Sequence, residues 1–340
     1  MANAMNYRRL GSSGLKVSAI CLGAMMFGDQ TDEAVAGRIV DSAFDAGVNF
    51  IDTADSYAKG GSERMVGKLI AKNRERWVLA TKVQSASIPG DPNSGGGGRK
   101  WMTYELEASL RRLATDYLDV YYMHRDDLET PVEETVSSLG DFIRAGKIRY
   151  IGLSNFDGWR IAEFVHACRR LGVPQPIVLQ PVYNAMNRLA EVEMFPACQY
   201  YGLGIVPYSP LARGVLTGKY LPGSKPGSDT RAGRSDRRML EAEFREESIK
   251  HAQRIKVHAE KRGMTAGQFA LNWVLNNRLV TAVLAGPRTE GQWREYLGAL
   301  HHKFDAQDEA LIDSLVAPGH ASTPGYTDPK FPILGRLPRA

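Results

Sequence analysis

Eight short apolar runs alternate with amphipathic segments along the chain, and this alternation predicts a closed (β/α)8 barrel. The runs are rich in β-branched residues and almost continuously apolar, which is typical of parallel strands covered by helices on the outside. Eight strand–helix units favour a barrel. The alternative is an open doubly wound sheet, but no GxGxxG motif follows the first run. The expected strands are 19–22, 48–51, 77–81, 119–123, 148–153, 177–180, 204–208 and 281–285. One domain is expected to span residues 1–340.

A β-hairpin is expected before the first barrel strand. Residues 7–10 and 15–17 flank a Gly-Ser-Ser-Gly turn. This hairpin would close the bottom of the barrel.

Residues that favour helix starts and helix ends mark the bounds of the expected helices between the strands. Thr130 and Pro131, followed by Glu133, read as a capping box with proline at the first helical position. Gly146 then supplies a left-handed helix end. Residues 265–268 and 289–292 are further capping boxes.

Three segments interrupt this regular pattern. Residues 84–100 are rich in Gly, Pro and Ser, and residues 211–241 form the longest irregular stretch. Both follow strands, so they are expected at the C-terminal rim as walls of a binding site. For the glycine-rich loop, a mobile surface excursion is the alternative. The proline-rich tail after Pro318 either covers the mouth of the barrel or contacts a neighbouring subunit in a homo-oligomer.

Composition excludes several classes of protein. The 340 residues carry a formal charge of +5 without a block of like charges, which argues against a nucleic-acid partner. The three cysteines are far apart and no CxxC occurs, as expected of a reducing cytoplasm, and no metal site is expected. An apolar leader and a long apolar run are both missing, so neither a signal peptide nor membrane association is expected.

Four polar residues lie at or shortly after the ends of consecutive expected strands. Asp52 follows the second strand with Tyr57 five positions on, Lys82 follows the third, and His124 follows the fourth. The carboxyl ends of barrel strands meet at one rim, so these side chains are expected to lie together. Each alone has a simpler explanation, such as a turn, a rim aromatic, a solvated strand end or a core histidine.

Together the four residues suit proton transfer to an oxygen atom. An ammonium lowers the pKa of a neighbouring phenol, so Lys82 is expected to act on Tyr57. Asp52 would hold Lys82 by a charge-assisted hydrogen bond. His124 would bind a substrate oxygen or relay a proton. Because no side chain supplies hydride, a nicotinamide cofactor is required.

Five sequence motifs resemble those of a known protein family. They are residues 47–57 (GVNFIDTADSY), 81–82 (TK), 111–124 (RRL to YLDVYYMH), 146–156 (GKIRYIGLSNF) and 207–211 (PYSPL). Over essentially its whole length the chain resembles the aldo-keto reductases, and it is closer to their bacterial and potassium-channel-β-like branches than to the aldose reductases. The resemblance implies a catalytic tetrad of Asp52, Tyr57, Lys82 and His124. It also implies an NAD(P)H-dependent oxidoreductase that reduces an aldehyde or ketone, with Tyr57 as general acid.

The resemblance also implies a cofactor that lies extended across the barrel mouth. Asn155 and Gln180 would bind the carboxamide, and Tyr208 would stack on the nicotinamide. Arg288 lies ahead of the last helix and favours NADP(H) over NAD(H). Gln292 would contact adenosine or act only as the capping partner of Thr289, and Tyr296 stands where the family often has Asn. The expected cofactor contacts are Gly23, Asp52, Ser154, Asn155, Gln180, Tyr208, Ser209, Pro210, Leu211, Arg213, Gly214, Lys219, Arg231, Gly286, Arg288, Gln292 and Glu295.

A small carbonyl compound is the expected partner. Arg125 would favour an anionic or polyhydroxylated substrate, unless it pairs with one of the acids at 126, 127 and 129. The expected substrate contacts are Met26, Phe27, Tyr57, Trp101, His124 and Arg125. Two other functions stay open: an NAD(P)-linked dehydrogenase of a sugar or alcohol, and a cofactor-binding regulatory β-subunit.

Overall fold

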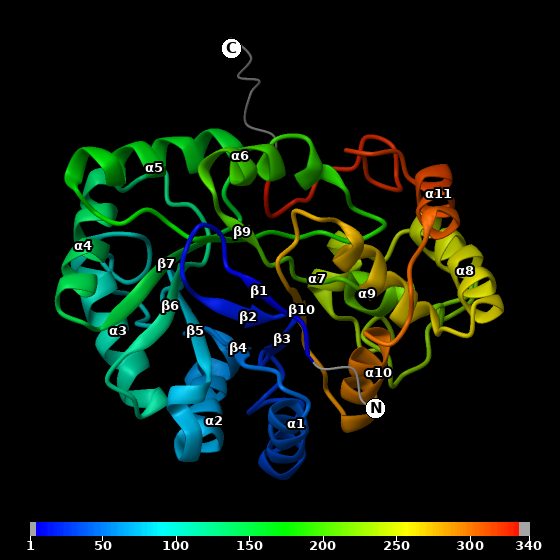
Figure 1. Cartoon of the computed structure of the whole chain (residues 1–340), viewed down its shortest axis with the longest axis horizontal. Helices are drawn as coiled ribbons and strands as arrows, with labels where there is room; N and C mark the ends of the chain where they lie inside the picture. Colours follow the sequence, from blue (N-terminus) through cyan, green and yellow to red (C-terminus); the bar gives the residue numbers. More distant parts are fainter. Residues whose placement is uncertain (1–4, 333–340) are drawn as a thin grey trace. The chain divides into compact units, whose positions relative to one another are not determined.

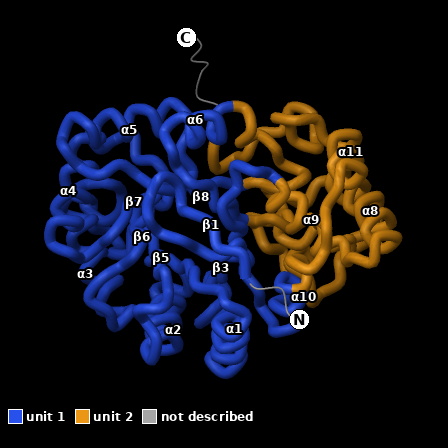
Figure 2. The backbone as a smooth tube through the Cα atoms, in the orientation of Figure 1, with its two compact units in different colours: residues 1–182, 193–208, 277–297 blue, residues 183–192, 209–276, 298–340 orange. Residues whose placement is uncertain are grey.

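The computed structural model describes residues 5–332 and divides the chain into two compact units (Figure 2). The first comprises Met1–Val182, Glu193–Tyr208 and Asn277–Leu297, and the second comprises Tyr183–Val192, Ser209–Asn276 and Gly298–Ala340. That residues 1–340 act as one domain stays a prediction.

The first unit contains a barrel of eight parallel strands. They follow one another in the order β10-β3-β4-β5-β6-β7-β8-β9. Pairing of Ile205 with Val280, together with a 3.0 Å hydrogen bond from Leu284 N to Pro207 O, joins the two ends. The strands are β3 (Ile20–Gly23), β4 (Phe50–Asp52), β5 (Val78–Val83), β6 (Leu118–Met123), β7 (Ile148–Ser154), β8 (Val178–Gln180), β9 (Gly204–Ile205) and β10 (Val283–Ala285). The predicted (β/α)8 barrel is thus confirmed. β9 is the strand that falls furthest short of its expected length.

Helices cover the outside of this barrel. Figure 1 shows α1 to α5 following one another around the strands in chain order. The helical segments are α1 (Glu33–Asp45), η1 (Tyr57–Gly60), α2 (Gly61–Ile70), η2 (Ala71–Arg76), α3 (Arg99–Leu113), α4 (Val132–Arg144), α5 (Gly158–Leu171), α6 (Met194–Tyr201) and α10 (Glu290–Ala299), whose last residues belong to the second unit.

The helix-capping predictions are confirmed in part. Thr265 Oγ1 accepts from Gln268 N at 3.1 Å while Gln268 Oε1 accepts from Thr265 N at 3.0 Å. Gly146 has the expected left-handed φ of 71°. The box at Thr130 is wrong, because Pro131 precedes α4 without a side-chain cap. The Thr130 hydroxyl instead donates to Asp127 Oδ2 at 2.7 Å.

The N-terminal hairpin, β1 (Tyr7–Arg9) and β2 (Lys16–Ser18), covers the N-terminal ends of the strands as predicted. An added Cβ at Gly11 in its turn would lie 2.4 Å from Ile177 O and 2.7 Å from Gly204 N, at the starts of β8 and β9. Leu10 and Val17 are fully buried in the same cluster as the barrel interior. The opposite, C-terminal end of the strands is therefore the end left for a site.

The second unit is helical. Its elements are η3 (Leu189–Glu191), η4 (Ala212–Thr217), α7 (Arg237–Ala242), α8 (Glu246–Lys261), α9 (Ala266–Asn276) and α11 (Ala306–Leu315). The predicted irregular stretch 211–241 thus contains η4 and most of α7.

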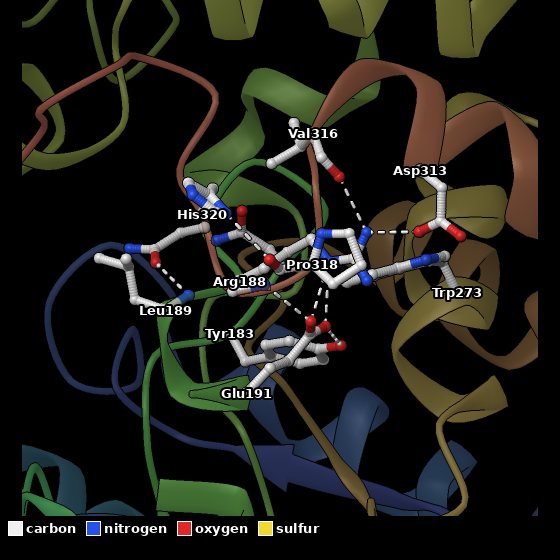
Figure 3. Close-up of polar contacts among 12 residues, drawn as sticks. Tyr183, Arg188, Leu189, Glu191, Trp273, Asp313, Val316, Pro318 and His320 are labelled. Carbon is white, nitrogen blue, oxygen red and sulfur yellow. Dashed lines mark hydrogen bonds and ion pairs between the residues drawn. The ribbon is translucent and has the colours of Figure 1, made fainter. Parts of the chain in front are cut away.

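Arg188 ties two distant segments of the second unit together (Figure 3). Its guanidinium donates to Glu191 Oε1 at 3.0 Å, to Asp313 Oδ1 at 2.6 Å and to the carbonyl of Val316 at 2.9 Å. Its backbone N–H donates to the carbonyl of His320 at 2.9 Å. These bonds anchor residues 313–320 on residues 188–191.

Side-chain contacts within the second unit hold part of the tail beyond this anchor. Asp328 forms a two-pronged ion pair with Arg238, and the Arg245 guanidinium lies 4.0 Å from the ring centroid of Tyr326. Residues 333–340, on which part of the tail prediction rests, lie outside the described residues. Within residues 5–332, no helix is long and apolar enough to cross a bilayer. All three cysteines are buried and unpaired there.

Candidate active site

The predicted site residues share one phase of the strand alternation. Successive strand side chains point to opposite faces, and the barrel interior contains Phe50, Ala80, Tyr122, Val178 and Val206. The residues two positions further along the chain must point the same way. They are Asp52, Lys82, His124, Gln180 and Tyr208. The strands therefore deliver these five side chains to the C-terminal end of the interior.

Lys82 and Asp52 form a buried ion pair. Asp52 is the last residue of β4 and Lys82 lies inside β5, one residue before its end, rather than beyond it. The Lys82 ammonium donates to Asp52 Oδ1 and to the carbonyl of Thr53 at 2.8 Å. Burial lowers the pKa of Lys82, but the charges of Asp52 and Tyr57 and the hydrogen bond to Asp52 outweigh this and raise the pKa above its ordinary value. The ammonium thus stays charged.

Tyr57 lies beside this ammonium. Lys82 Nζ is 5.0 Å from the centroid of the tyrosine ring. Burial raises the pKa of Tyr57 and the Lys82 charge lowers it, with burial the larger effect, so the pKa is above that of a free tyrosine. The expected effect of Lys82 is therefore present but does not dominate. A phenol in this state keeps its proton at neutral pH.

Asn155 connects His124 with Tyr208. Its side-chain nitrogen donates to the His124 carbonyl at 2.9 Å, and its side-chain oxygen accepts from the Tyr208 hydroxyl at 2.8 Å. The rings of His124 and Tyr57 meet edge to face, with centroids 5.8 Å apart. The amide predicted to bind a cofactor is thus engaged by the backbone of His124 and by the side chain of Tyr208.

Several residues at the strand ends adopt left-handed backbone angles, which cost free energy in any residue but glycine. Ala58 and Lys59 follow Tyr57 with φ of 48° and 52°, Gln84 follows β5 with φ of 148°, and Asn155 follows β7 with φ of 57°. Such strain is characteristic of functional sites. In the second unit, Ser209, Ala212 and Arg213 continue the pattern with φ of 58°, 46° and 51°.

Three buried acidic side chains, Asp55, Glu63 and Glu105, lie close to one another near Tyr57. Glu63 accepts from Arg112 at 2.5 Å and from Thr81 Oγ1 at 2.6 Å, and Glu105 accepts from the same arginine. Asp55, two residues before Tyr57, is also buried, and its Oδ1 has no hydrogen-bond partner among the described residues. Burial and the charges of Glu105 and Glu63 raise the pKa of Asp55 to about 7.

The nicotinamide end of the expected cofactor fits the residues of the first unit. An added Cβ at Gly23 would lie 3.4 Å from the Cα of Gly286, so these two glycines leave the rim between β3 and β10 without side chains. Tyr208 is half-buried and fixed by its hydroxyl. Ser154 Oγ accepts from Asn155 Nδ2 at 2.9 Å. A flat amide-bearing ring matches this combination of aromatic face and amide donors.

The expected phosphate contacts are divided between the units. In the first, Gln292 Oε1 accepts from Arg288 N at 2.7 Å and Gln292 N donates to Thr289 Oγ1 at 3.3 Å, so Gln292 does act as a capping residue. In the second, Lys219 Nζ would lie 3.1 Å from an added Cβ at Gly214, and Arg231 is 3.9 Å from Asp236. Residues 212–214 all have positive φ, and the N–H groups of Ala212 and Gly214 donate to the carbonyls of Ser209 and Leu211 at 2.9 and 2.8 Å.

The expected substrate contacts differ in exposure. Phe27 is fully buried, while Met26 and Trp101 retain only 7% and 3% exposure. Trp101 packs on Tyr104, and within residues 5–332 its indole nitrogen has no hydrogen-bond partner. Half-buried His124 and exposed Arg125 are the accessible members at the end of β6.

Sequence reasoning missed Gln84 and Asp55 as site residues. From the sequence, Gln84 was assigned only to the glycine-rich loop, as its first residue, and Asp55 only to the motif of residues 47–57. A polar residue two positions beyond Lys82 on the same strand phase was the signal available for Gln84. For Asp55, its position between Asp52 and Tyr57 was the signal.

These elements define a barrel enzyme of the oxidoreductase class, with a buried ammonium, a phenol and an imidazole at the C-terminal end of the strands. The sequence profile described as "Aldo/keto reductase family" matches residues 19–317. The chain belongs to the aldo/keto reductase family, whose members use nicotinamide cofactors on small carbonyl compounds.

Known proteins of several kinds are similar over most of this chain. An uncharacterised oxidoreductase of Bacillus subtilis is 35% identical, with 94% of this chain and 98% of the relative aligned. A probable voltage-gated potassium channel subunit beta of Arabidopsis thaliana is 38% identical over 87% of this chain and 91% of its own. The L-glyceraldehyde 3-phosphate reductase of Escherichia coli is 33% identical over 93% of both chains.

Proposed function

We propose that the protein reduces an aldehyde or ketone to an alcohol with NADPH, and that Tyr57 is the general acid. The placement of Lys82 carries this proposal. Its ammonium is buried between the Asp52 carboxylate and the Tyr57 ring. Such a cation stabilises the phenolate that remains after the proton has left.

Each of the four polar residues has a separate role in proton transfer. Tyr57 holds its proton at neutral pH because burial raises its pKa. As the proton moves to the carbonyl oxygen, the charge that develops on the phenol oxygen faces Lys82, and Asp52 keeps that ammonium in place. His124 orients the carbonyl oxygen from the neighbouring strand. The nicotinamide, when bound, supplies hydride to the carbonyl carbon.

NADP is proposed over NAD because each unit carries cations among the expected phosphate contacts. Arg288 lies two residues before the start of α10 and makes no side-chain ion pair within residues 5–332. Lys219 and Arg231 lie in the second unit. Guanidinium groups suit a 2′-phosphate.

The test is consumption of NADPH by purified protein with a panel of activated aldehydes. Turnover is expected with the wild type, and Tyr57→Phe should lose at least ~10²-fold in kcat while binding NADPH normally. Absence of turnover across the panel with bound cofactor would refute the proposal. Equal weakening of NADP and NAD binding in Arg288→Ala would refute the phosphate assignment.

A regulatory role is the second candidate. It rests on the relative named as a probable voltage-gated potassium channel subunit beta. In that case the protein should bind NADPH tightly, show negligible steady-state turnover and co-purify with a channel protein. Oxidation of an alcohol by the same residues in reverse would appear as NADP reduction at high pH.

A further inference from the structure

Gln84 joins three segments that border Tyr57 and His124. Its backbone N–H donates to Asp55 Oδ2 at 3.3 Å, and its carbonyl accepts from Gly96 N in the glycine-rich loop at 2.9 Å. Its side-chain nitrogen donates to the carbonyl of Asp126 at 3.1 Å. The residue is buried and holds its left-handed φ of 148° through these bonds. These hydrogen bonds therefore fix the backbone and side-chain conformation of Gln84.

The remaining polar atom of Gln84, Oε1, accepts a hydrogen bond from Arg125 Nε. Val83 pairs with Met123, and His124 N donates to Val83 O at 2.9 Å, so β5 and β6 are still adjacent where the two side chains meet. This single bond restricts the planar guanidinium and uses only one of its five N–H groups. The other four, on the two terminal nitrogens, have no partner among residues 5–332.

Arg125 also lacks a counter-charge. Among the described residues it forms no ion pair, and its side chain is exposed. The neighbouring acids are engaged elsewhere. Asp126 receives Arg160 Nε on both oxygens at 3.0 and 2.8 Å.

Asp127, the next acid, accepts from Gly97 N and Thr130 Oγ1, each at 2.7 Å. Glu129 is exposed and pairs with no described cation. The expected alternative, that Arg125 pairs with one of these three acids, is wrong for this structure.

We propose that Arg125 is a specificity residue that binds a carboxylate or phosphate of the substrate, so that the protein prefers small aldehydes carrying an anionic group. This inference rests on the proposed reductase function. Arg125 directly follows His124, so their Cα atoms are about 3.8 Å apart. Successive strand side chains point to opposite faces, but β6 ends at Met123, and Arg125 Nε is held by the side chain of Gln84, two positions beyond Lys82 on the same strand phase. An anion held by Arg125 is therefore placed at the same end of the barrel as a carbonyl held by His124. A guanidinium binds such groups with two parallel hydrogen bonds.

Gln84 acts as a positioning residue in this proposal. An exposed arginine normally loses side-chain entropy when it binds. The bond to the buried amide restricts Arg125 before the substrate arrives. The partner is neutral, so the positive charge stays available for the ligand.

The experiment compares a carboxylate substrate with its neutral ester. Steady-state kinetics with NADPH would use 4-oxobutanoate and methyl 4-oxobutanoate, which share one aldehyde, and glycolaldehyde phosphate with glycolaldehyde as a phosphate pair. The wild type should favour each anion at least tenfold in kcat/KM. Arg125→Gln should remove this preference by raising KM for the anions at least tenfold more than KM for their neutral counterparts.

Conservative variants and a control sharpen the test. Arg125→Lys should keep part of the preference, and Gln84→Ala should raise KM for the anions by less than Arg125→Gln. Arg144→Gln, which removes an equally exposed arginine at the end of α4, should change nothing, because the C-terminal ends of the helices lie at the opposite end of the barrel. Equal effects of Arg125→Gln on anion and ester would overturn the proposal.

A binding measurement separates this inference from the proposed function. Calorimetric titration with the product 4-hydroxybutanoate should show binding to the wild type that Arg125→Gln weakens at least tenfold. If neither substrate is turned over but this difference is found, the reductase proposal fails and the anion site stands. If the wild type does not bind the carboxylate at all, the anion site is refuted whatever the turnover.

Discussion

Gln180 donates from its side-chain nitrogen to Asp52 Oδ2 at 3.0 Å, across the barrel interior from β8 to β4. These strands are four places apart in an eight-stranded closed sheet, so the bond spans the barrel. It occupies one carboxylate oxygen and leaves the other aimed at Lys82. The expected carboxamide ligand is thus also the group that orients Asp52.

Removing one partner of the buried Asp52–Lys82 pair should destabilise the protein strongly. Asp52→Asn leaves an ammonium without a counter-charge in a fully buried position, and about 3–5 kcal/mol of unfolding free energy should be lost. Guanidinium denaturation at pH 7 measures this. The double variant Asp52→Asn/Lys82→Met should recover most of the loss, since no charge is then buried alone. A single variant within 1 kcal/mol of the wild type would contradict the buried-pair assignment.

Asn155 allows the side-chain role to be separated from backbone strain. Both Asn155→Ala and Asn155→Gly lose the bonds to His124 and Tyr208, but only glycine adopts the left-handed φ without cost. The glycine variant should be about 1 kcal/mol more stable than the alanine variant by thermal or urea unfolding. Both should show the same reduced kcat. A glycine variant with full kcat would show that the amide does not orient the site.

Asp55 should make stability fall as pH rises. Its pKa is raised from 3.8 to about 7 in the folded protein, so between these values the folded chain holds a proton that the unfolded chain has lost. Protonated Asp55 fits the acidic surroundings, and its ionisation costs free energy. The penalty should accumulate from about pH 4 to pH 7 and stay constant above, reaching at most about 4 kcal/mol.

Unfolding in urea at pH 5 and pH 8 measures the effect of Asp55. Asp55→Asn should be more stable relative to the wild type at pH 8 than at pH 5. Glu243→Gln offers a matched comparison in the second unit, because burial also raises the pKa of Glu243 to about 7. A stability difference between Asp55→Asn and wild type that is independent of pH would refute the assignment.

Arg188→Ala should increase the mobility of residues 313–320 and leave the stability of the barrel strands unchanged. The variant takes the cation away from Glu191, which keeps the neutral donors Tyr183 Oη and Gly319 N, and removes the Arg188 donor from the carbonyl of Val316. Arg188 retains only 5% exposure. A loss of about 3 kcal/mol or more is expected. Hydrogen exchange should accelerate at residues 188–191 and 316–322 while the strands β3 to β8 keep their protection. Arg188→Lys should rescue little, because one ammonium cannot serve three acceptors in a plane.

The strands and the four polar residues were readable from the sequence because both follow local rules. Apolar runs identify the strands, and the two-residue alternation sends Asp52, Lys82 and His124 to the same side as Phe50, Ala80 and Tyr122. Strand bounds shifted by a few residues, since hydrogen bonding between neighbours decides where a strand ends. Lys82 accordingly lies within β5.

Tertiary contacts decided what the sequence could not show. The Thr130 hydroxyl has the spacing of a cap but bonds Asp127, which also accepts from Gly97 N in the distant glycine-rich loop. Gln84 gathers partners from three separate segments, and no sequence spacing encodes that convergence. The opposing effects on the pKa of Tyr57 likewise depend on how deeply the ring is covered.

The shared strand phase has a consequence for how the length of this chain can vary. Deleting one residue between Val120 and His124 would turn the imidazole outward toward the helices, while the same deletion between Asp127 and Thr130 would leave every strand in register. A scan of single-codon deletions should therefore show that deletions within the strands abolish folding, whereas deletions in the loops that follow the strands are tolerated. Lineages of this protein would diverge in loop length long before they diverge in the strand ends.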